Sequence, residues 1–420
     1  MKGRFARFLA TCLLLPAALG LVACGKSSSG GGQGAGGVKT GPGVTDKQIT
    51  LGVLTDLTGV FGPLGTSLTQ AQQAFWKQQN AAGGVCNRKV KLLVKDHGYD
   101  PQKAVTLYRD MEPNVASLQQ LLGSPITVAL LPQLQRNSML AQLSAWPPSL
   151  LKAEQIEITG TTYDIEAING IDWMVQNKGL KSGDKIGDLY FEGDYGEGGL
   201  IGVKYAAQKH GLKVVEQKIK ATDTDMSAAV NAFKREGVSA MWITTGPKQL
   251  ASAAGVAKSV GLNVPIGANG PAFSPELLKT PVGKSLEANL TSFASVAPYS
   301  LNKPAVKKAG AAFKKAYPKG VEQQSVIAGW AMSEVGKEIL DKACQNKDLT
   351  REGLVKAYRS LSNVDTGGLV AGPMDFSKVG QPSTKEIYVL KTDGSSPGGQ
   401  KAITGPYTSP NAKGYQPSGS

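Results

Sequence analysis

Few side chains in this 420-residue sequence are suited to acid–base or metal chemistry. His97 and His210 are its only histidines, and it contains no Cys-x-x-Cys pair that could join them at a zinc site. A His-Glu-x-x-His metal motif and a complete phosphate-binding loop ending in Lys-Ser/Thr are also missing, and no paired carboxylates stand out. The sequence therefore predicts a protein that is not an enzyme and that uses neither a metal nor a cofactor.

The chemistry that the sequence does indicate is lipidation near the N-terminus. A short basic segment precedes an apolar run over 8–21 that is too short to cross a membrane as a mature helix. The run ends in Leu-Val-Ala-Cys, which resembles a lipobox, where the cysteine thiol takes a diacylglyceryl group. We therefore expect residues 1–23 to be a signal peptide and Cys24 to anchor an extracytoplasmic protein to the cell membrane. An ordinary secretory signal cleaved elsewhere is the alternative.

Cysteine usage is consistent with that compartment. Cys12 would leave with the signal peptide and Cys24 would carry the lipid, so that Cys86 and Cys344 remain in the mature chain. Two cysteines outside the cytoplasm commonly oxidise, which predicts a disulfide between them. Metal binding by these cysteines is the weaker alternative.

The charge and the two ends of the chain bear on its partners. The formal net charge is +14, but the lysines are scattered and are not interleaved with aromatic residues, so no nucleic-acid partner is predicted. A position at an anionic membrane surface accounts for the basic balance. Residues 24–45 and 395–420 are rich in Gly, Ser or Pro, which predicts a flexible tether and a flexible tail without regular structure.

Between these ends, β-rich runs alternate with helical patterns. The first helical pattern, 68–79, has one apolar stripe, and Thr66 or Ser67 is suited to cap its N-terminus. Because consecutive strands joined by helices must be parallel, we expect an α/β protein with two doubly wound parallel-sheet lobes and a ligand beyond the carboxyl ends of the strands. The predicted strands are 49–54, 90–94, 118–122, 156–159, 185–191, 214–219, 240–244 and 264–267, and a second helix is predicted over 102–111.

Several short motifs follow one another in an order typical of a known family. They are Leu-Gly-Val-Leu-Thr-Asp-Leu-Thr-Gly from residue 51, Asn-Ala-Ala-Gly-Gly from 80, Asp96 with Asp100-Pro101, Tyr-Gly-Glu-Gly from 195, and Asp-Thr-Asp from 223. Over roughly residues 47–395 the chain resembles the leucine/isoleucine/valine-type periplasmic binding proteins of ABC transporters, which have the type I fold. No single motif is specific; the ordered series behind a lipobox carries the resemblance.

The resemblance implies that the chain passes between the lobes three times, through a three-stranded hinge. Lobe I is then expected over 46–163 and 297–365, and lobe II over 164–296 and 366–394. This division puts Cys86 and Cys344 in the same lobe.

The resemblance also implies a set of ligand-binding positions. Thr127, with Ser124 as its rival, falls where the family binds a ligand carboxylate through a hydroxyl, and ordinary helix capping is the alternative for both. Tyr195 is expected to cover the ligand from lobe II, unless it only packs at a helix start. The remaining positions are Thr161, Thr162 and Tyr163, which otherwise form a surface turn, and Leu64, which otherwise belongs to the core.

The sequence departs from the family where amino-acid binders hold the ligand's ammonium group with an acidic residue. Asn269 stands in that stretch, and the neighbouring tyrosine position is Gly246 or Pro247. Without a carboxylate, a charge-assisted hydrogen bond is lost. We therefore predict that the ligand is not a standard branched-chain amino acid. A carboxylate, an amide or an aromatic acid fits this site at least as well.

Together these features predict a monomeric solute-binding lipoprotein of an ABC importer, which closes its lobes on a small molecule and delivers it to the permease and ATPase subunits. A sensor of the same fold that signals to a membrane receptor is the alternative, and a purely structural surface lipoprotein is a third reading.

Overall fold

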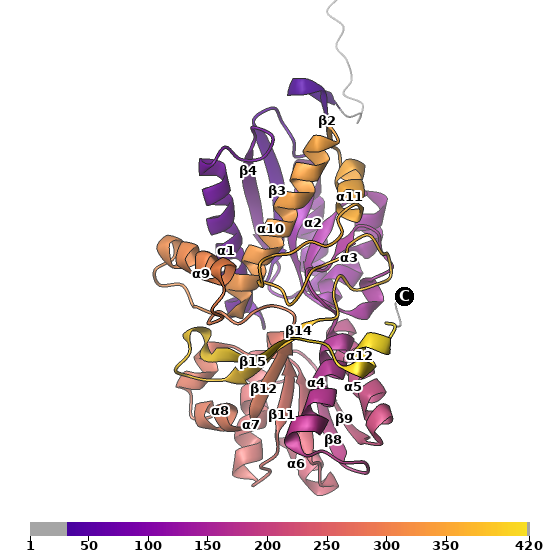
Figure 1. The fold of residues 1–420 in the computed structure, drawn as a ribbon, viewed down its shortest axis with the longest axis vertical. Helices are drawn as coiled ribbons and strands as arrows, with labels where there is room; N and C mark the ends of the chain where they lie inside the picture. Colours follow the sequence, from indigo (N-terminus) through magenta and orange to yellow (C-terminus); the bar gives the residue numbers. More distant parts are fainter. Residues whose placement is uncertain (1–31, 418–420) are drawn as a thin grey trace, which may run out of the picture.

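The computed structural model describes residues 32–417, which form two lobes stacked along the long axis of the molecule (Figure 1). The predicted signal peptide and Cys24 lie outside these residues. Each lobe is a sheet of mainly parallel strands with helices packed against it. The predicted α/β fold with two parallel-sheet lobes is confirmed. Within 32–417, no helix is long and apolar enough to cross a membrane.

Lobe I is built on a parallel sheet of order β4-β3-β5-β6-β7. Helices α1 and α10 pack closely together against it. Helix α9 contacts both of them, and α11 contacts α10. The strands are β3 (Gln48–Thr55), β4 (Lys89–Asp96), β5 (Ser117–Leu122), β6 (Ala141–Ser144) and β7 (Ile156–Glu157). The helices are α1 (Gly62–Ala81), α2 (Pro101–Met111), α3 (Ser124–Arg136), α9 (Pro304–Ala316), α10 (Gln324–Gln345) and α11 (Arg351–Arg359).

Lobe II is built on a sheet of order β15-β14-β12-β11-β10-β8-β9, in which β14 and β15 are antiparallel additions at one edge. Its strands are β8 (Lys185–Phe191), β9 (Lys213–Ile219), β10 (Ala240–Thr244), β11 (Ile266–Asn269), β12 (Leu290–Ala294), β14 (Ile387–Thr392) and β15 (Gln400–Tyr407). Its helices are α4 (Tyr163–Lys178), α5 (Asp194–His210), α6 (Ser227–Glu236), α7 (Pro247–Ser259), α8 (Gly283–Asn289) and α12 (Pro410–Gly414). The 3-10 turns of the two lobes are η2 (Glu112–Asn114), η3 (Pro148–Leu150), η4 (Gly270–Ala272), η5 (Pro275–Lys279) and η6 (Pro397–Gly399).

Three segments connect the lobes and are hydrogen-bonded to one another. The Ser383 hydroxyl contacts the carbonyl oxygens of Ile158 and Gly160, at 2.9 and 2.7 Å. The Ala371 N–H donates to the Ser295 carbonyl at 2.8 Å. The Ser383 bonds join the third connection to the first, which contains Ile158 and Gly160. The Ala371 bond joins the third connection to the second, which contains Ser295, so the three connections form one bonded hinge.

Both ends of the described chain contain regular structure that differs from the predicted tether and tail. Strands β1 (Gly32–Gly34) and β2 (Val38–Thr40), with η1 (Ala35–Gly37) between them, form a small sheet with β13 (Asp348–Leu349). At the other end, β15 pairs with β14, and α12 packs on α4. Backbone pairing with open strand edges supplies the stabilisation that the Gly- and Ser-rich side chains cannot.

Helix α1 begins earlier than its predicted cap at Thr66 or Ser67. It starts at Gly62, with a proline in its first turn, a position where the fixed φ of proline favours helix. A Cβ on Gly65 would lie 1.9 Å from the Asp56 carbonyl oxygen, so glycine lets the helix begin directly against the end of β3. The apolar stripe extends far enough toward the N-terminus to place Leu64 and Leu68 at the lobe interface.

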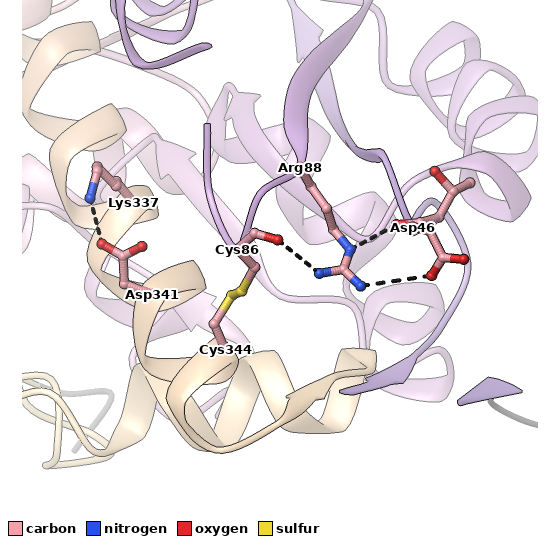
Figure 2. Close-up of a disulfide and its surroundings, with 7 residues drawn as sticks. Asp46, Cys86, Arg88, Lys337, Asp341 and Cys344 are labelled. Atoms are coloured by element: carbon pink, nitrogen blue, oxygen red, sulfur yellow. Dashed lines mark hydrogen bonds and ion pairs between the residues drawn. A yellow bond between two sulfur atoms is a disulfide. The ribbon is translucent and has the colours of Figure 1, made fainter. Parts of the chain in front are cut away.

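Cys86 and Cys344 form the predicted disulfide within lobe I, with their Cα atoms 6.2 Å apart (Figure 2). This separation lies in the usual range for such bonds. Arg88, which is only 3% exposed, stands beside it and donates from Nε to the Thr45 carbonyl and from Nη1 to the Cys86 carbonyl, at 2.8 and 3.1 Å. The disulfide links the turn before β4 to the end of α10, two parts of lobe I that are 258 residues apart.

Candidate ligand-binding site

A cavity lies where the two lobes meet, beyond the carboxyl ends of their parallel strands. It has about 80 Å³ of room for solvent, several times the ~10–15 Å³ that one water needs. Within 32–417, none of the side chains that line it is charged. The lobe I lining is Phe61, Leu64, Leu68, Tyr99, Leu122, Gly123, Ser124, Ser144, Trp146, Gln323, Gln324, Ser325 and Ala328. The lobe II and hinge lining is Tyr163, Tyr195, Gly270, Pro271, Phe273, Pro275, Ala294 and Val296.

Five aromatic rings form a continuous wall that spans both lobes. Neighbouring ring centroids are 5.8 Å apart for Trp146 and Tyr163, 4.7 Å for Tyr163 and Tyr195, 5.9 Å for Tyr195 and Phe61, and 5.0 Å for Phe61 and Tyr99. The pairs adopt tilted or edge-to-face geometry, the arrangement that such rings favour. The wall therefore gives the cavity a large apolar surface that is complete only when the lobes are together.

Hydrogen bonds hold two of these rings in place. The Tyr195 hydroxyl donates to the Thr245 carbonyl at 3.1 Å, so its polar end is satisfied within lobe II. The Tyr163 N–H donates to the Trp146 carbonyl at 3.0 Å, which fixes the start of α4 against lobe I. Both residues belong to the predicted site and both line the cavity.

Ser124 is the polar residue best placed to bind a ligand. It begins α3, lines the cavity and is 1% exposed. Its hydroxyl lies close to that of Tyr163 but makes no hydrogen bond of normal length and angle with any residue that the structure describes. Because the first turn of a helix also leaves N–H groups without intrahelical partners, this corner of the cavity offers donors to an anion.

Gly123 shapes the same corner. Its φ is 102°, and a Cβ there would lie 2.8 Å from the Tyr99 ring. A residue with a side chain could not adopt this backbone without strain or displace the ring without cost. The chain therefore turns sharply from β5 into α3 and leaves Ser124 beside the aromatic wall.

Thr127 does not line the cavity, although it was the first choice for a carboxylate-binding hydroxyl. It lies one turn further along α3, fully buried, and its hydroxyl donates to the Gly123 carbonyl at 2.9 Å. Its rival Ser124 lines the cavity. This bond is not a helix cap, because the hydroxyl donates to a carbonyl that already accepts from the Thr127 N–H at 3.0 Å, and no side-chain cap bond precedes α3.

Thr161 and Thr162 lie in the first hinge segment and do not line the cavity. Both are fully buried, and the Thr161 N–H donates to the Ser295 hydroxyl at 3.2 Å. This contact joins two of the three connecting segments. The structure thus places these threonines in the hinge, while Leu64 lies in the lining.

Asn269 and Gly246 do not line the cavity either. The Asn269 side chain, at the end of β11, is turned into lobe II. The Asn269 amide donates from Nδ2 to a Glu166 carboxyl oxygen at 2.7 Å and accepts from the Thr244 hydroxyl at 2.9 Å. Gly246 only precedes the first turn of α7. Gly270 and Pro271, the residues after Asn269, form this part of the wall instead.

Burial raises the pKa of Glu166 to about 8, and hydrogen bonds from Asn269 and from the Ser295 N–H only partly oppose that shift. The charged form is disfavoured because the carboxyl group has no access to water. Burial therefore favours the protonated form of this group. The acidic residue that contacts Asn269 is thus engaged within the protein.

A family model described as "Periplasmic binding protein" matches residues 48–399. The chain belongs to this family. A solved fatty acid ABC transporter substrate-binding protein from Thermomonospora curvata is 45% identical, with a TM-score of 0.90 and coverage of 92% of this chain and 99% of its own. The predicted resemblance to the branched-chain amino acid group, and its type I fold, are confirmed.

More distant periplasmic binding proteins share the fold. A branched chain amino acid ABC transporter protein from Thermus thermophilus with bound valine is 17% identical, with a TM-score of 0.76 and coverage of 87% of this chain and 98% of its own. A solute binding protein from R. palustris in complex with 4-hydroxybenzoate is 17% identical, with a TM-score of 0.73 and coverage of 87% of this chain and 98% of its own. A Leu/Ile/Val-binding protein homolog of Brucella melitensis is 24% identical over 200 residues, 46% of this chain and 54% of its own length, so the match spans about half of that relative.

Much of the lining of this periplasmic binding protein was not predicted, including Phe61, Tyr99, Trp146 and Phe273. Each lies in a loop that follows the carboxyl end of a parallel strand, where ligands bind in such folds. An aromatic residue soon after a predicted strand end is the signal that could have found Phe61, Tyr99 and Phe273, whereas Trp146 follows β6, a strand that the sequence analysis did not predict. Among the described residues, no group of three or more His, Cys, Asp or Glu side chains could hold a metal ion.

Proposed function

We propose that this periplasmic binding protein is the solute-binding component of an ABC importer, and that its ligand is a carboxylic acid with an apolar body. One observation carries the proposal: an uncharged cavity between the lobes, walled by aromatic rings, is lined by three residues with a buried donor that makes no hydrogen bond of normal geometry among the described residues, namely the hydroxyls of Ser124 and Ser325 and the indole N–H of Trp146. Pockets of this kind gain affinity from the apolar walls and selectivity from a few placed polar groups.

The polar groups around the cavity favour an acid over an amino acid. Ser124 and the first turn of α3 can donate hydrogen bonds to a carboxylate. An ammonium group is held best by a carboxylate, but no carboxylate of the described residues lines the cavity, and the nearby Glu166 is bonded to Asn269. The relative at 45% identity, described as a fatty acid transporter component, supports the same class of ligand.

The sequence also supports a cellular arrangement. We propose that Cys24 carries a lipid that anchors the chain outside the cytoplasm, and that the permease recognises the closed pair of lobes before the solute is passed on. The proposed binding unit is a monomer. Neither enzymatic chemistry nor a nucleic-acid partner is proposed.

The test is a binding screen on the chain from residue 32 onward, by thermal shift and calorimetry. The panel contains straight-chain carboxylates, benzoates, the alcohols of the same chain lengths, leucine and valine. A ligand at 100 times its Kd stabilises the folded state by about 2.7 kcal/mol, so carboxylates should raise the Tm where the matched alcohols do so less. Binding of leucine or valine alone would contradict the ligand class, and no binding across the panel would contradict solute capture.

A further inference from the structure

The segment after β6 belongs to lobe I but contacts lobe II beside the cavity. It consists of Trp146, Pro147, Pro148 and Ser149, and we call it the proline loop. Trp146 lines the cavity, the two prolines are buried, and Ser149 is exposed. Because each proline has a fixed φ angle, the loop loses little conformational freedom when it is held against another element.

The proline loop rests on the first turns of α5 in lobe II. A Cβ on Gly198 would lie 3.1 Å from Pro148 Cδ and 3.6 Å from Pro147 Cα, so the absence of a side chain at Gly198 lets the loop approach the helix. The Ser149 hydroxyl donates to an Asp194 carboxylate oxygen at 2.9 Å, at the first residue of α5. Because the loop and α5 belong to different lobes, these contacts require the lobes to be together.

Lobe I carries the proline loop. Leu150, the residue directly after it, is 1% exposed in the lobe I core, and its N–H donates to the Pro147 carbonyl at 3.3 Å. The next residue, Leu151, accepts from the Gly380 N–H at 2.9 Å, on the third connection between the lobes. A motion that parts the lobes at α5 therefore separates the loop from Gly198.

Trp146 connects the proline loop to the ligand site. Its ring belongs to the aromatic wall, 5.8 Å from that of Tyr163. Its indole N–H is buried and makes no hydrogen bond of normal geometry with any residue that the structure describes. A buried donor without a partner costs free energy, so an acceptor on a ligand beside this ring is favoured. A ligand in the cavity thus meets the same loop whose next residues contact α5.

We infer that the proline loop is a latch for ligand capture: Trp146 contacts the bound ligand, and the rest of the loop holds lobe II closed over it. Gly198 is the positioning residue of this latch, because only a residue without a side chain admits Pro148 at this distance. The inference rests on the proposed function, since it needs a ligand between the lobes. It adds the residues that set how slowly the ligand leaves.

The first experiment compares two helical glycines that differ in what faces them. Gly198→Ala puts a Cβ against Pro148 of the other lobe, whereas the matched control Gly255→Ala puts one 3.2 Å from Val282 Cγ1, within lobe II. Alanine favours helix over glycine, so both variants should fold. Calorimetry measures Kd for butanoate, octanoate, dodecanoate and benzoate. For each ligand that binds, Kd of Gly198→Ala should exceed that of Gly255→Ala by about five- to tenfold, because the added methyl opposes closure.

Kinetics and two further variants tie this effect to the latch. The rise in Kd should lie in koff, with kon within about twofold, because the latch forms after the ligand has entered. Pro148→Ala removes the ring atom that the new Cβ meets, so the double variant with Gly198→Ala should bind about threefold tighter than the two single effects together predict. Of the five tryptophans, all within the described residues, only Trp146 lines the cavity, so Trp146→Phe should lose most of the fluorescence change on binding.

The outcomes separate the latch from the proposed function. Equal Kd values for Gly198→Ala and Gly255→Ala, a loss confined to kon, or a fluorescence change that persists in Trp146→Phe overturns the inference while the proposed function stands. Failure of the wild type to bind any of the four carboxylates overturns the proposed function, and the inference falls with it. If Gly198→Ala does not fold, Ser149→Ala replaces it, with about a twofold rise in Kd expected and an unchanged Kd counting against the latch.

Discussion

Ser124, in the lobe I lining of the cavity, and the Asn269–Glu166 pair, which lies behind the lobe II lining, are buried polar groups in opposite states. On the lobe I side, the Ser124 hydroxyl is buried without a hydrogen bond of normal geometry in the described chain. On the lobe II side, Asn269 and Glu166 are equally buried but bond to each other. A buried polar group without a partner costs free energy, so the unsatisfied hydroxyl gains more from a ligand than the satisfied pair does. The satisfied pair serves to fix the shape of the wall.

Replacing Ser124 by Ala should have the largest effect on this contrast. A hydrogen bond to a charged group is worth about 1.5–3 kcal/mol, so Kd for a carboxylate should rise by roughly 10- to 100-fold. The alcohol of the same chain length should lose much less, because it carries no charge. Calorimetry with the two ligands measures the difference, and equal losses for both would show that Ser124 does not bind the carboxylate.

Asn269→Asp tests whether the lobe II wall can be made to bind an ammonium group. A second carboxyl next to Glu166 forces one of the two to hold a proton, and the unfolding free energy should fall by about 2 kcal/mol. Leucine should still not bind, because the side chain does not line the cavity. Asn302→Asp, at an exposed position, is the control for chemical denaturation. Tight leucine binding by Asn269→Asp would show that this side chain reaches the ligand.

Glu166→Gln should change how stability depends on pH. The folded-state pKa of about 8 lies above the ordinary value of 4.5, so the folded protein binds a proton more readily and stability falls as pH rises between these values. The glutamine variant lacks this contribution. Its unfolding free energy should therefore fall by about 1 to 2 kcal/mol less than that of the wild type between about pH 6 and pH 8. Parallel stability curves for the two proteins would mean that Glu166 is not protonated in the folded state.

Thr127→Val should have the smallest effect and should separate the two hydroxyls of α3. The variant loses the bond to the Gly123 carbonyl, which should lower the unfolding free energy by about 1 kcal/mol. Carboxylate affinity should remain within about twofold of the wild type, because this hydroxyl is already used inside the helix. A loss of affinity as large as that of Ser124→Ala would make Thr127 a ligand-binding residue after all.

The fold was largely predictable because strand runs and their helices alternate along the chain. The predicted bounds of β8 and β10 coincide with those observed, and the disulfide followed from counting cysteines. The tail was not predictable in the same way: Gly, Pro and Ser dominate residues 395–420, yet β15 forms there because β14 offers it an open edge. Pairing with a distant strand is not visible in local composition.

The site was predictable only in part, because sequence spacing does not show where a side chain lies once its helix is placed. Ser124 and Thr127 are three positions apart on one helix, and both are hydroxyl residues after a strand. Only the carbonyl of Gly123 distinguishes them, since it takes up the Thr127 hydroxyl. Similarly, the hinge bond of Thr161 depends on Ser295, which is 134 positions away in the sequence.

The bond between Cys86 and Cys344 has a consequence for the order in which the molecule folds. A chain made from its N-terminus presents Cys86 long before Cys344, 258 residues later. Strands β8 to β12, which lie between the two cysteines, form a continuous parallel stretch of lobe II. That part of lobe II can therefore assemble while lobe I still lacks α10. The disulfide can form only after Cys344 on α10 has been made. Lobe I, the part of the protein that is made first, is therefore completed by one of the helices that are made last.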